Sequence, residues 1–209
     1  RQEIRNSKFW GEFKVAAYNT AAEYRDIFYN NKIFTDKQFS RMDDVELVSM
    51  LLNIFIKCID SDTPTSIDRL YGKFDKSFDD YETIKPKFDL TMKVINSIYE
   101  YLNGNIHCFS GKQYFYTLFA ALVHQLYGLP VLDAPRKSEY SSEHISEHMP
   151  CLLDRLAQFE NHFERCIIDK ASWYDMYVEF TEFEKLHRTR TTNKTERFER
   201  VKFLSNYIA

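Results

Sequence analysis

The stretch DDVELVSMLLNIFIKCI, residues 43–59, contains the longest strongly apolar run of the chain. Its apolar side chains follow a helical repeat so densely that they predict a helix buried over much of its surface. Asp43 and Asp44 precede the apolar residues, and acidic side chains at a helix start interact favourably with the positive end of the helix dipole. We therefore expect a central helix here, with the rest of the core packed around it.

Apolar residues also recur at three- and four-residue steps on both sides of this segment, which predicts further amphipathic helices. These are expected at about residues 13–30, 65–78, 86–102, 112–126, 151–167, 173–186 and 194–208. No segment keeps up the alternation of apolar and polar residues that is typical of a strand, and glycine and proline number only five each, which favours long helices. The predicted fold class is all-α, an irregular bundle of about seven or eight helices.

Local capping signals predict where these helices begin and end. The predicted starts are at Ser7, Thr35, Asp43, Thr65, Ser110 and Asn193, and the predicted ends are at Asn30, Asn103 and Gly128. Pro86 is expected to mark a helix boundary or a first-turn position, since proline lacks the N–H that the interior of a helix requires.

The length of 209 residues suits a single helical domain, residues 1–209, with residues 143–209 as a looser C-terminal subdomain in the alternative reading. The polar, turn-rich interval 130–142 is the expected exposed linker. The chain opens without methionine on a segment dense in polar groups, and we expect it to be a fragment of a longer protein.

The formal net charge of −3 argues against a globally basic nucleic-acid binder. The cysteines are far apart and form no C-x-x-C pair, which predicts reduced core thiols in a cytoplasmic protein. They are Cys58, Cys108, Cys151 and Cys166. The apolar run at residues 45–59 is too short and too polar to cross a bilayer, so no membrane partner is expected.

The segment His144-Ile-Ser-Glu-His148 has the H-x-x-E-H spelling of inverted zinc peptidases, in which two histidines bind zinc and the glutamate acts as general base. Pro150 follows closely and is expected to disturb the helix that this geometry needs. The sequence marks out no third ligand. We therefore predict no metal site, and interpret His144 and His148 as part of a solvated turn.

No other catalytic group is predicted. Cys108 follows His107, but adjacent residues do not face each other on a helix. Cys166 and His162 lie in an apolar context, where burial raises the pKa of a thiol instead of lowering it. No glycine-rich phosphate-binding motif is present, so no cofactor is expected to bind this chain.

A basic stretch near the C-terminus is the candidate nucleic-acid contact. It comprises Arg188, Arg190, Lys194 and Arg197, with threonine hydroxyls between them and a predicted helix start at Asn193. Arginines, hydroxyls and free helix N–H groups together suit a phosphate. The alternative is a solvated helix cap and loop with scattered charge.

The opening segment carries the second candidate site, at Gln2, Glu3, Arg5 and Asn6. Arg5 and Asn6 suit bidentate hydrogen bonding to either a buried carboxylate or a phosphate. The alternative is an internal polar network that fixes how this segment meets a preceding domain. The sequence leaves these readings open.

Three stretches resemble one family. QEIRNSKF at residues 2–9, followed by GEFK at 11–14, resembles the segment that begins the helical half of GmrSD-type proteins. RMDDVELV at 41–48 resembles the second marker of that family, and SIDRLY at 66–71 continues in its style. The resemblance covers about residues 1–130 well and the rest loosely.

Members of this family act in prokaryotic defence, as restriction systems against modified or phage DNA. Their N-terminal domain resembles the ParB/sulfiredoxin fold and carries an Asp-Gly-Gln-Gln-Arg motif linked to nucleotide binding, and many members carry a His-Asn-His nuclease domain downstream. Neither motif occurs here. The resemblance implies that a nucleoside triphosphate would bind in the missing domain, and that the whole protein would be a nucleotide-dependent restriction or nicking enzyme.

The resemblance thus implies a non-catalytic helical module that supports or regulates an adjoining nucleotide-dependent domain and contacts DNA. It places Gln2, Glu3, Arg5 and Asn6 at the junction with that domain. The rival hypothesis is a stand-alone helical protein-interaction adaptor without a nucleic-acid role, and a third is a helical metalloenzyme using His144 and His148. Whether the protein forms a homo-oligomer is left open.

Overall fold

The computed structural model describes residues 2–132 and 141–209, and in them every regular element is helical, which confirms the all-α prediction. The elements are α1 (Gln2–Lys8), α2 (Glu12–Glu23), α3 (Arg25–Asn30), α4 (Asp36–Ser40), α5 (Asp43–Lys57), α6 (Pro64–Lys73), α7 (Tyr81–Leu102), α8 (Lys112–Tyr127), α9 (Ile145–Phe163), a π-helical turn η1 (Glu164–Ile168), α10 (Tyr177–Arg188) and α11 (Lys194–Ile208).

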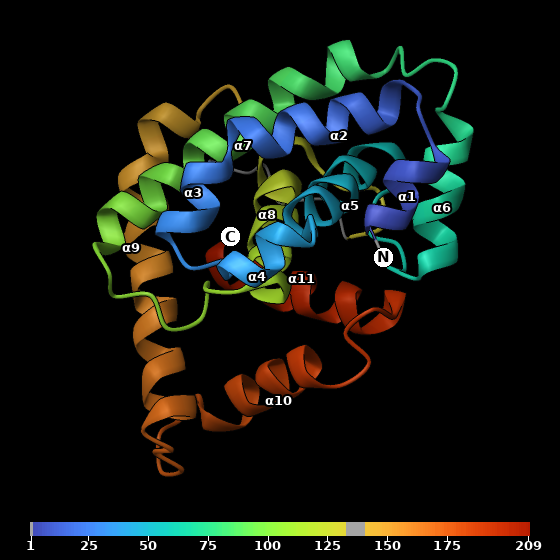
Figure 1. The fold of residues 1–209 in the computed structure, drawn as a ribbon. Helices are drawn as coiled ribbons and strands as arrows, with labels where there is room; N and C mark the ends of the chain where they lie inside the picture. Colours follow the sequence, from blue (N-terminus) through green and yellow to red (C-terminus); the bar gives the residue numbers. More distant parts are fainter. Residues whose placement is uncertain (1, 133–140) are drawn as a thin grey trace.

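The helices α5 and α8 lie in the middle of the bundle (Figure 1). The helix α5 packs on α2, α8, α4, α6, α7 and α1, while α8 packs on α11, α5 and α7. The helix that the sequence predicted to be central, α5, therefore lies in the middle of the bundle. The helix α10 lies at the lower edge in Figure 1 and contacts α11 and η1.

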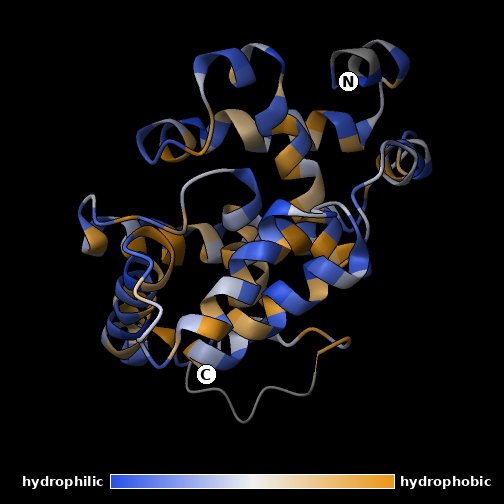
Figure 2. Ribbon diagram, turned by 90° about the horizontal axis from the view of Figure 1, so that it is seen from below, coloured by the Kyte–Doolittle hydropathy of each residue, from blue (hydrophilic) through white to orange (hydrophobic). Residues whose placement is uncertain are grey.

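The core is one hydrophobic cluster that is rich in phenylalanine and runs from Phe13 to Ile208. Most helices carry both hydrophilic and hydrophobic residues along their length (Figure 2), as the helical periodicity requires. The aromatic rings meet mainly edge to face or tilted, as in the pairs Phe28–Phe115 and Phe159–Phe183. These are the arrangements that the aromatic quadrupole favours.

The N-terminal segment differs from the prediction. Ser7 does not begin a helix, because it lies inside α1, and the next helix begins after Gly11. At Gly11 a Cβ atom would lie 1.7 Å from the carbonyl oxygen of Asp75, so only glycine fits this close backbone approach. The predicted single helix also ends at Tyr24, where the chain turns from α2 into α3.

Two prolines lie inside helices where boundaries were expected. Pro86 is the sixth residue of α7, and Pro150 is the sixth residue of α9. The N–H groups of a helix's first turn have no intrahelical acceptor, so a proline just after that turn removes a single hydrogen bond near a helix end. The prediction of a disturbed helix beside His148 was therefore wrong, because α9 runs through this segment.

Most other capping signals are confirmed. The start of α4 has a capping box in which Gln38 Oε1 accepts from the Thr35 backbone N–H at 2.8 Å. The helix α7 ends at Asn103, and α11 begins after Asn193. The start of α6 lies two residues before the predicted Thr65, at Thr63, whose side chain accepts from the Ser66 N–H at 3.1 Å.

Three further sequence predictions concern the start of a helix, the linker and the cysteines. The helix α10 begins at Tyr177 and not at Trp173. Most of the predicted linker lies outside the described residues, and at its near end Leu132 is buried. Cys108 and Cys166 are core thiols as expected, whereas Cys151 is exposed on α9.

Candidate functional site

The structure places a buried network of charged and polar groups beneath α1. Arg5 is almost fully buried, and its Nε donates to Asp68 Oδ1 at 2.7 Å while its Nη1 donates to Glu46 Oε2 at 2.8 Å. The same Nη1 lies 3.0 Å from Gln2 Oε1. Charge-assisted hydrogen bonds of this length are among the strongest that side chains make. They tie α1 to α5 and α6.

Glu46 links this network to α8. Its second oxygen accepts from Lys112 Nζ at 2.7 Å, so the carboxylate lies between two cations. Burial alone would raise the pKa of the Glu46 carboxyl, but Lys112 and Arg5 together outweigh it and lower the pKa to about 2. Glu46 therefore remains ionised whenever the protein is folded near neutral pH.

A chain of neutral hydrogen bonds continues from Gln2. Gln2 Nε2 donates to the Tyr71 hydroxyl at 2.7 Å, and Tyr71 lies 2.8 Å from Ser49 Oγ. Ser49 Oγ donates to the Val45 carbonyl at 2.7 Å. Because the Ser49 proton is used there, the Tyr71 hydroxyl must donate to Ser49. The donors of this chain therefore run in one direction, from Gln2 through Tyr71 and Ser49 to the Val45 carbonyl.

These contacts involve two of the four candidate residues of the opening segment. Arg5 Nη1 donates to Gln2 Oε1, and of the two partners that the sequence left open for Arg5, a carboxylate and a phosphate, the described residues supply carboxylates. The backbones of Glu3 and Asn6 belong to α1, and their side chains lie outside the described part of the structure. Their role at a domain junction stays a prediction.

Next to this network, Arg197 and Asp62 form a second buried pair. Arg197 Nη2 lies 3.6 Å from Asp62 Oδ2, its Nη1 donates to the Asp60 carbonyl at 2.9 Å, and its guanidinium stacks 3.9 Å from the Tyr116 ring centre. Burial raises the pKa of Asp62, against the opposing pull of Arg197. Arg197 is thus fixed inside the protein, so we leave it out of the candidate nucleic-acid surface.

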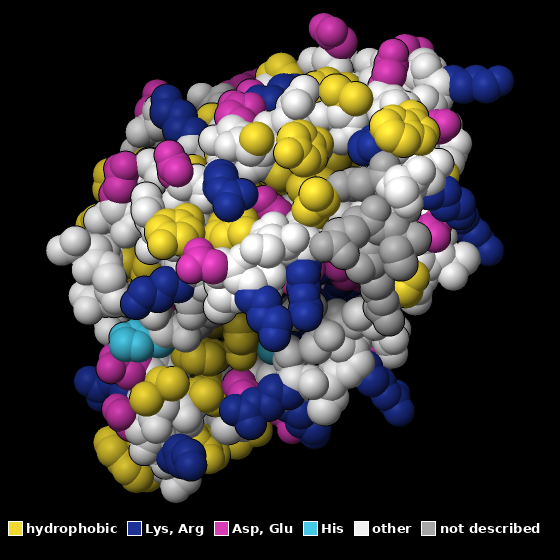
Figure 3. Space-filling view, viewed as in Figure 1, with side chains coloured by type: hydrophobic (Ala, Val, Ile, Leu, Met, Phe, Trp, Pro, Cys, Tyr) yellow, Lys and Arg dark blue, Asp and Glu magenta, His cyan; other side chains and the backbone are white. Residues whose placement is uncertain are grey.

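The other members of the basic stretch are accessible. Arg188, Arg190 and Lys194 are exposed, and Arg188 pairs with Glu184 one turn earlier on α10. Figure 3 shows Lys and Arg side chains over α10. The nucleic-acid contact at these three residues stays a prediction, and so does its alternative of a solvated loop.

The histidine pair of the H-x-x-E-H segment lies at the start of α9. His144 Nδ1 is 2.9 Å from Ser141 Oγ, and no group of three or more metal-ligating side chains occurs in residues 2–132 and 141–209.

His187 is buried, stacks on Tyr114 with ring centres 3.9 Å apart, and has its Nδ1 2.8 Å from the Phe183 carbonyl, which places the proton on Nδ1. Burial lowers its pKa well below the usual range.

The cysteine–histidine pairs are engaged structurally. Glu160 is buried and accepts the backbone N–H groups of His107, Cys108 and Phe109 at 2.7, 2.7 and 3.0 Å. Burial raises the pKa of the Cys108 thiol well above its usual value. His162 Nδ1 lies 2.8 Å from the Tyr207 hydroxyl. The thiols of Cys108 and Cys166 are therefore neutral core groups at neutral pH.

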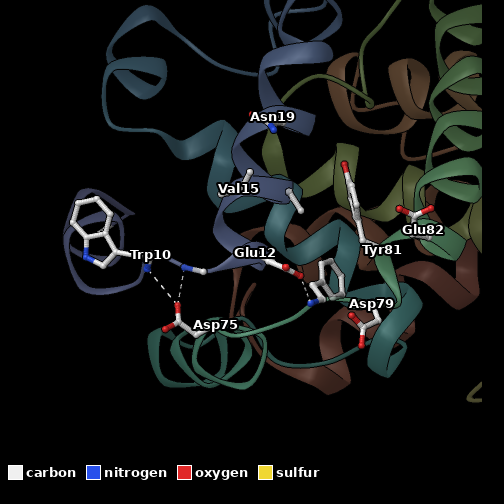
Figure 4. A pocket seen from close by; sticks show the side chains of 11 residues that line it. Trp10, Glu12, Val15, Asn19, Asp75, Asp79, Tyr81 and Glu82 are labelled. Carbon is white, nitrogen blue, oxygen red and sulfur yellow. Dashed lines mark hydrogen bonds between the residues drawn. The ribbon is translucent and has the colours of Figure 1, made fainter.

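A cleft of about 540 Å³ opens between α2 and the segment that leads from α6 into α7 (Figure 4). One wall is α2, with Val15 and Asn19, and the opposite wall is the segment from Asp75 to Glu82. Asp75 Oδ1 accepts the N–H groups of Trp10 and Gly11 at 3.2 and 2.8 Å. Glu12 Oε2 accepts the Phe78 N–H at 2.7 Å, so the two walls are fastened to each other.

Asp68, Lys112 and the contacts of Glu46 with two cations were not predicted from the sequence. An acid inside the apolar run of α5 was the available signal, since a buried carboxylate needs a partner. The cleft was not predicted either, because no local pattern indicates that Trp10 and Asp79 line the same cavity.

Comparison of the chain with known protein families, characterised proteins and solved structures gives no match. None of the helices in the described residues is both long enough and apolar enough to span a bilayer.

Proposed function

We propose that this chain is a non-catalytic helical module of a GmrSD-type prokaryotic defence protein, which supports or regulates an adjoining nucleotide-dependent domain. The observation that carries the proposal is the network beneath α1. Arg5 is held by Glu46 and Asp68, and Glu46 is held by Lys112. A helix fastened in this way to α5, α6 and α8 suits the transmission of force or movement between the core and a preceding domain.

The roles of the reactive side chains support a structural module. Glu160 holds three backbone N–H groups, His187 stacks in the core, and Arg5 holds two carboxylates. These are the groups that general acid–base chemistry or phosphate binding would otherwise use. Each is committed to a contact that holds helices together.

The proposal makes a direct prediction about the gene. The reading frame upstream of the codon for Arg1 should encode an Asp-Gly-Gln-Gln-Arg motif within about 100–150 residues, one domain's length. The complete gene product should hydrolyse nucleoside triphosphate, and the 209-residue chain alone should not. A gene that encodes nothing before Arg1, or hydrolysis by the chain alone, would overturn the proposal.

DNA contact by the exposed basic stretch is the second part of the proposal. Arg188 and Arg190 lie on either side of the Thr189 hydroxyl, next to the start of α11. Replacing both by glutamate in the complete protein should weaken DNA binding and flatten its dependence on salt, because phosphate contacts release counterions. Electrophoretic mobility shifts across a salt series measure this. Glu182→Lys with Glu179→Lys adds positive charge on the same helix, so it is the control for a charge change of opposite sign. Binding that does not change across the series would remove the idea.

The adaptor hypothesis keeps one specific observation in its favour. Trp10, Val15 and Tyr18 are large apolar side chains that are 50–77% exposed. A gene product without a nucleotide-dependent domain, combined with a protein partner at this surface, would favour the adaptor.

A further inference from the structure

The cleft between α2 and the segment 75–82 has an apolar interior. Val15 and Ala16 from α2 line it together with Phe78 and Tyr81. Figure 4 shows Val15 and Tyr81 on opposite walls. Val15 is 52% exposed, so this wall is open to solvent. A cleft of about 540 Å³ lies within the range of roughly 300–1,000 Å³ in which proteins bind small molecules or the side chains of a partner.

Carboxylates surround that apolar interior. Glu12, Asp75, Asp79 and Glu82 line the cleft, and no lysine or arginine is among its lining residues in the described part of the chain. Asp79 and Glu82 are exposed and lie beside Tyr81 (Figure 4). The rim therefore attracts a cation, while the interior favours an aliphatic or aromatic group.

The aromatic ring at the mouth already contacts a cation of the chain itself. Trp10 is 77% exposed, and Lys14 Nζ lies 4.3 Å from the centre of its ring. Tryptophan is the aromatic side chain that attracts cations most strongly. Figure 3 shows hydrophobic side chains gathered over α2, so the exposed apolar surface continues beyond the cleft. An exposed apolar patch bordered by polar groups is typical of an interaction site.

We propose that this cleft, together with Trp10, is the docking site for a basic segment of a partner protein, in which arginine or lysine alternates with apolar residues. Charge complementarity selects the occupant. The carboxylate rim repels the phosphates of nucleic acid, and a simple metal cation would make no use of the apolar wall. A long basic side chain matches both features, because its aliphatic stem packs on apolar surface while its charged head reaches the carboxylates. This inference goes beyond the proposed function and does not depend on it.

The test uses a fluorescein-labelled peptide of alternating arginine and leucine, with a glutamate–leucine peptide of equal length as its counterpart. Fluorescence anisotropy measures binding to the protein. A Trp173→Phe background leaves Trp10 as the reporting tryptophan, because the chain has two. Quenching of Trp10 then shows whether the peptide reaches this cleft.

The key variant is Asp79→Asn with Glu82→Gln, which removes two rim charges at exposed positions. Asp79 precedes the first residue of α7 by two, and Glu82 lies in its first turn. The matched control is Glu143→Gln with Glu147→Gln, which changes the net charge equally at exposed positions two residues before α9 and in its first turn. Both variants should fold, and far-ultraviolet circular dichroism checks this.

The arginine–leucine peptide should bind and quench Trp10, and the Asp79/Glu82 variant and Trp10→Ala should each bind it about tenfold more weakly. The Glu143/Glu147 control should bind as the parent does. Raising the salt from about 0.1 M to about 1 M, which shortens the Debye length from about 10 Å to about 3 Å, should weaken binding. Equal weakening in the control, equal binding of the acidic peptide, or absence of binding would each overturn the proposal.

Discussion

Arg5 and Arg200 are both buried arginines, and their surroundings differ. The Arg5 side chain is 4% exposed and lies within 2.8 Å of two carboxylates. Arg200 is fully buried, and its Nη1 and Nη2 each lie 3.3 Å from a backbone carbonyl, of Leu186 and of Thr191. The structure shows no carboxylate in ion-pair contact with Arg200 among the described residues.

The pKa values follow the partners. Burial alone would lower the pKa of Arg5, but Glu46 and Asp68 raise it above its usual value. Burial and the nearby Arg197 lower the pKa of Arg200 to about 10. Arg5 is thus an ionic tie between helices, whereas Arg200 satisfies carbonyls at and beyond the C-terminal end of α10. Equal burial of the same side chain therefore does not indicate an equal role.

The largest expected effect comes from replacing each arginine by methionine. Arg5→Met leaves Glu46 and Asp68 without a shared cation and should lower the free energy of unfolding by about 3 kcal/mol. Arg200→Met removes a charge that has no carboxylate partner and should change it by about 1 kcal/mol or less, because only weak hydrogen bonds to carbonyls are lost. Urea denaturation measures both.

A double-mutant cycle sharpens this contrast. Glu46→Gln combined with Arg5→Met should destabilise the protein by clearly less than the sum of the two single changes, because each single change already breaks their pair. Glu46→Gln combined with Arg200→Met should be additive. Equal losses for Arg5→Met and Arg200→Met would remove the distinction between the two sites.

The two regions should also lose stability at different pH values, and this effect is smaller. The pKa of His187 lies well below 6.5 in the folded protein, so the unfolded chain takes up this proton first and stability falls as pH drops below 6.5. The loss should grow as the pH falls from 6.5 toward 5. The pKa of Glu46 is lowered to about 2, so its stabilisation is complete above pH 4.5 and disappears as pH falls toward 2. Acid should therefore weaken α10 and α11 before it weakens the network under α1.

Amide hydrogen exchange at a series of pH values, corrected for the intrinsic rate, locates these losses. His187→Phe keeps an aromatic ring against Tyr114 and should reduce the slope between pH 6.5 and 5. His124 and His162, whose pKa values burial also lowers, should supply the slope that is left. Glu46→Gln should flatten the slope below pH 4.5 and leave the upper range unchanged. Loss of protection in α1 at pH 5.5, with α10 still protected, would contradict this order.

Local signals predicted those parts of the fold that depend on neighbours in the chain. The capping box at Thr35 and the left-handed Asn103 are caps whose donors and acceptors lie within a few residues, and Asp43 is an acidic residue in the first turn of α5. Pro150 was misread because its effect depends on its distance from a helix start that the sequence did not reveal. Gly11 was not recognised because its reason lies in Asp75, 64 residues along the chain.

The sequence by itself determined the all-α class, the central apolar helix and the presence of an arginine at position 5 that suits a bidentate partner. Periodicity and capping are local properties, so they can be read without coordinates. Only the tertiary structure decided that this partner is a pair of carboxylates, that Arg197 points inward while Arg188 points outward, and that Trp10 stands at an acidic cleft. Those outcomes depend on which groups the packing brings within a few ångströms of one another although they lie 40 residues or more apart in the chain. A local sequence pattern contains no information about such contacts.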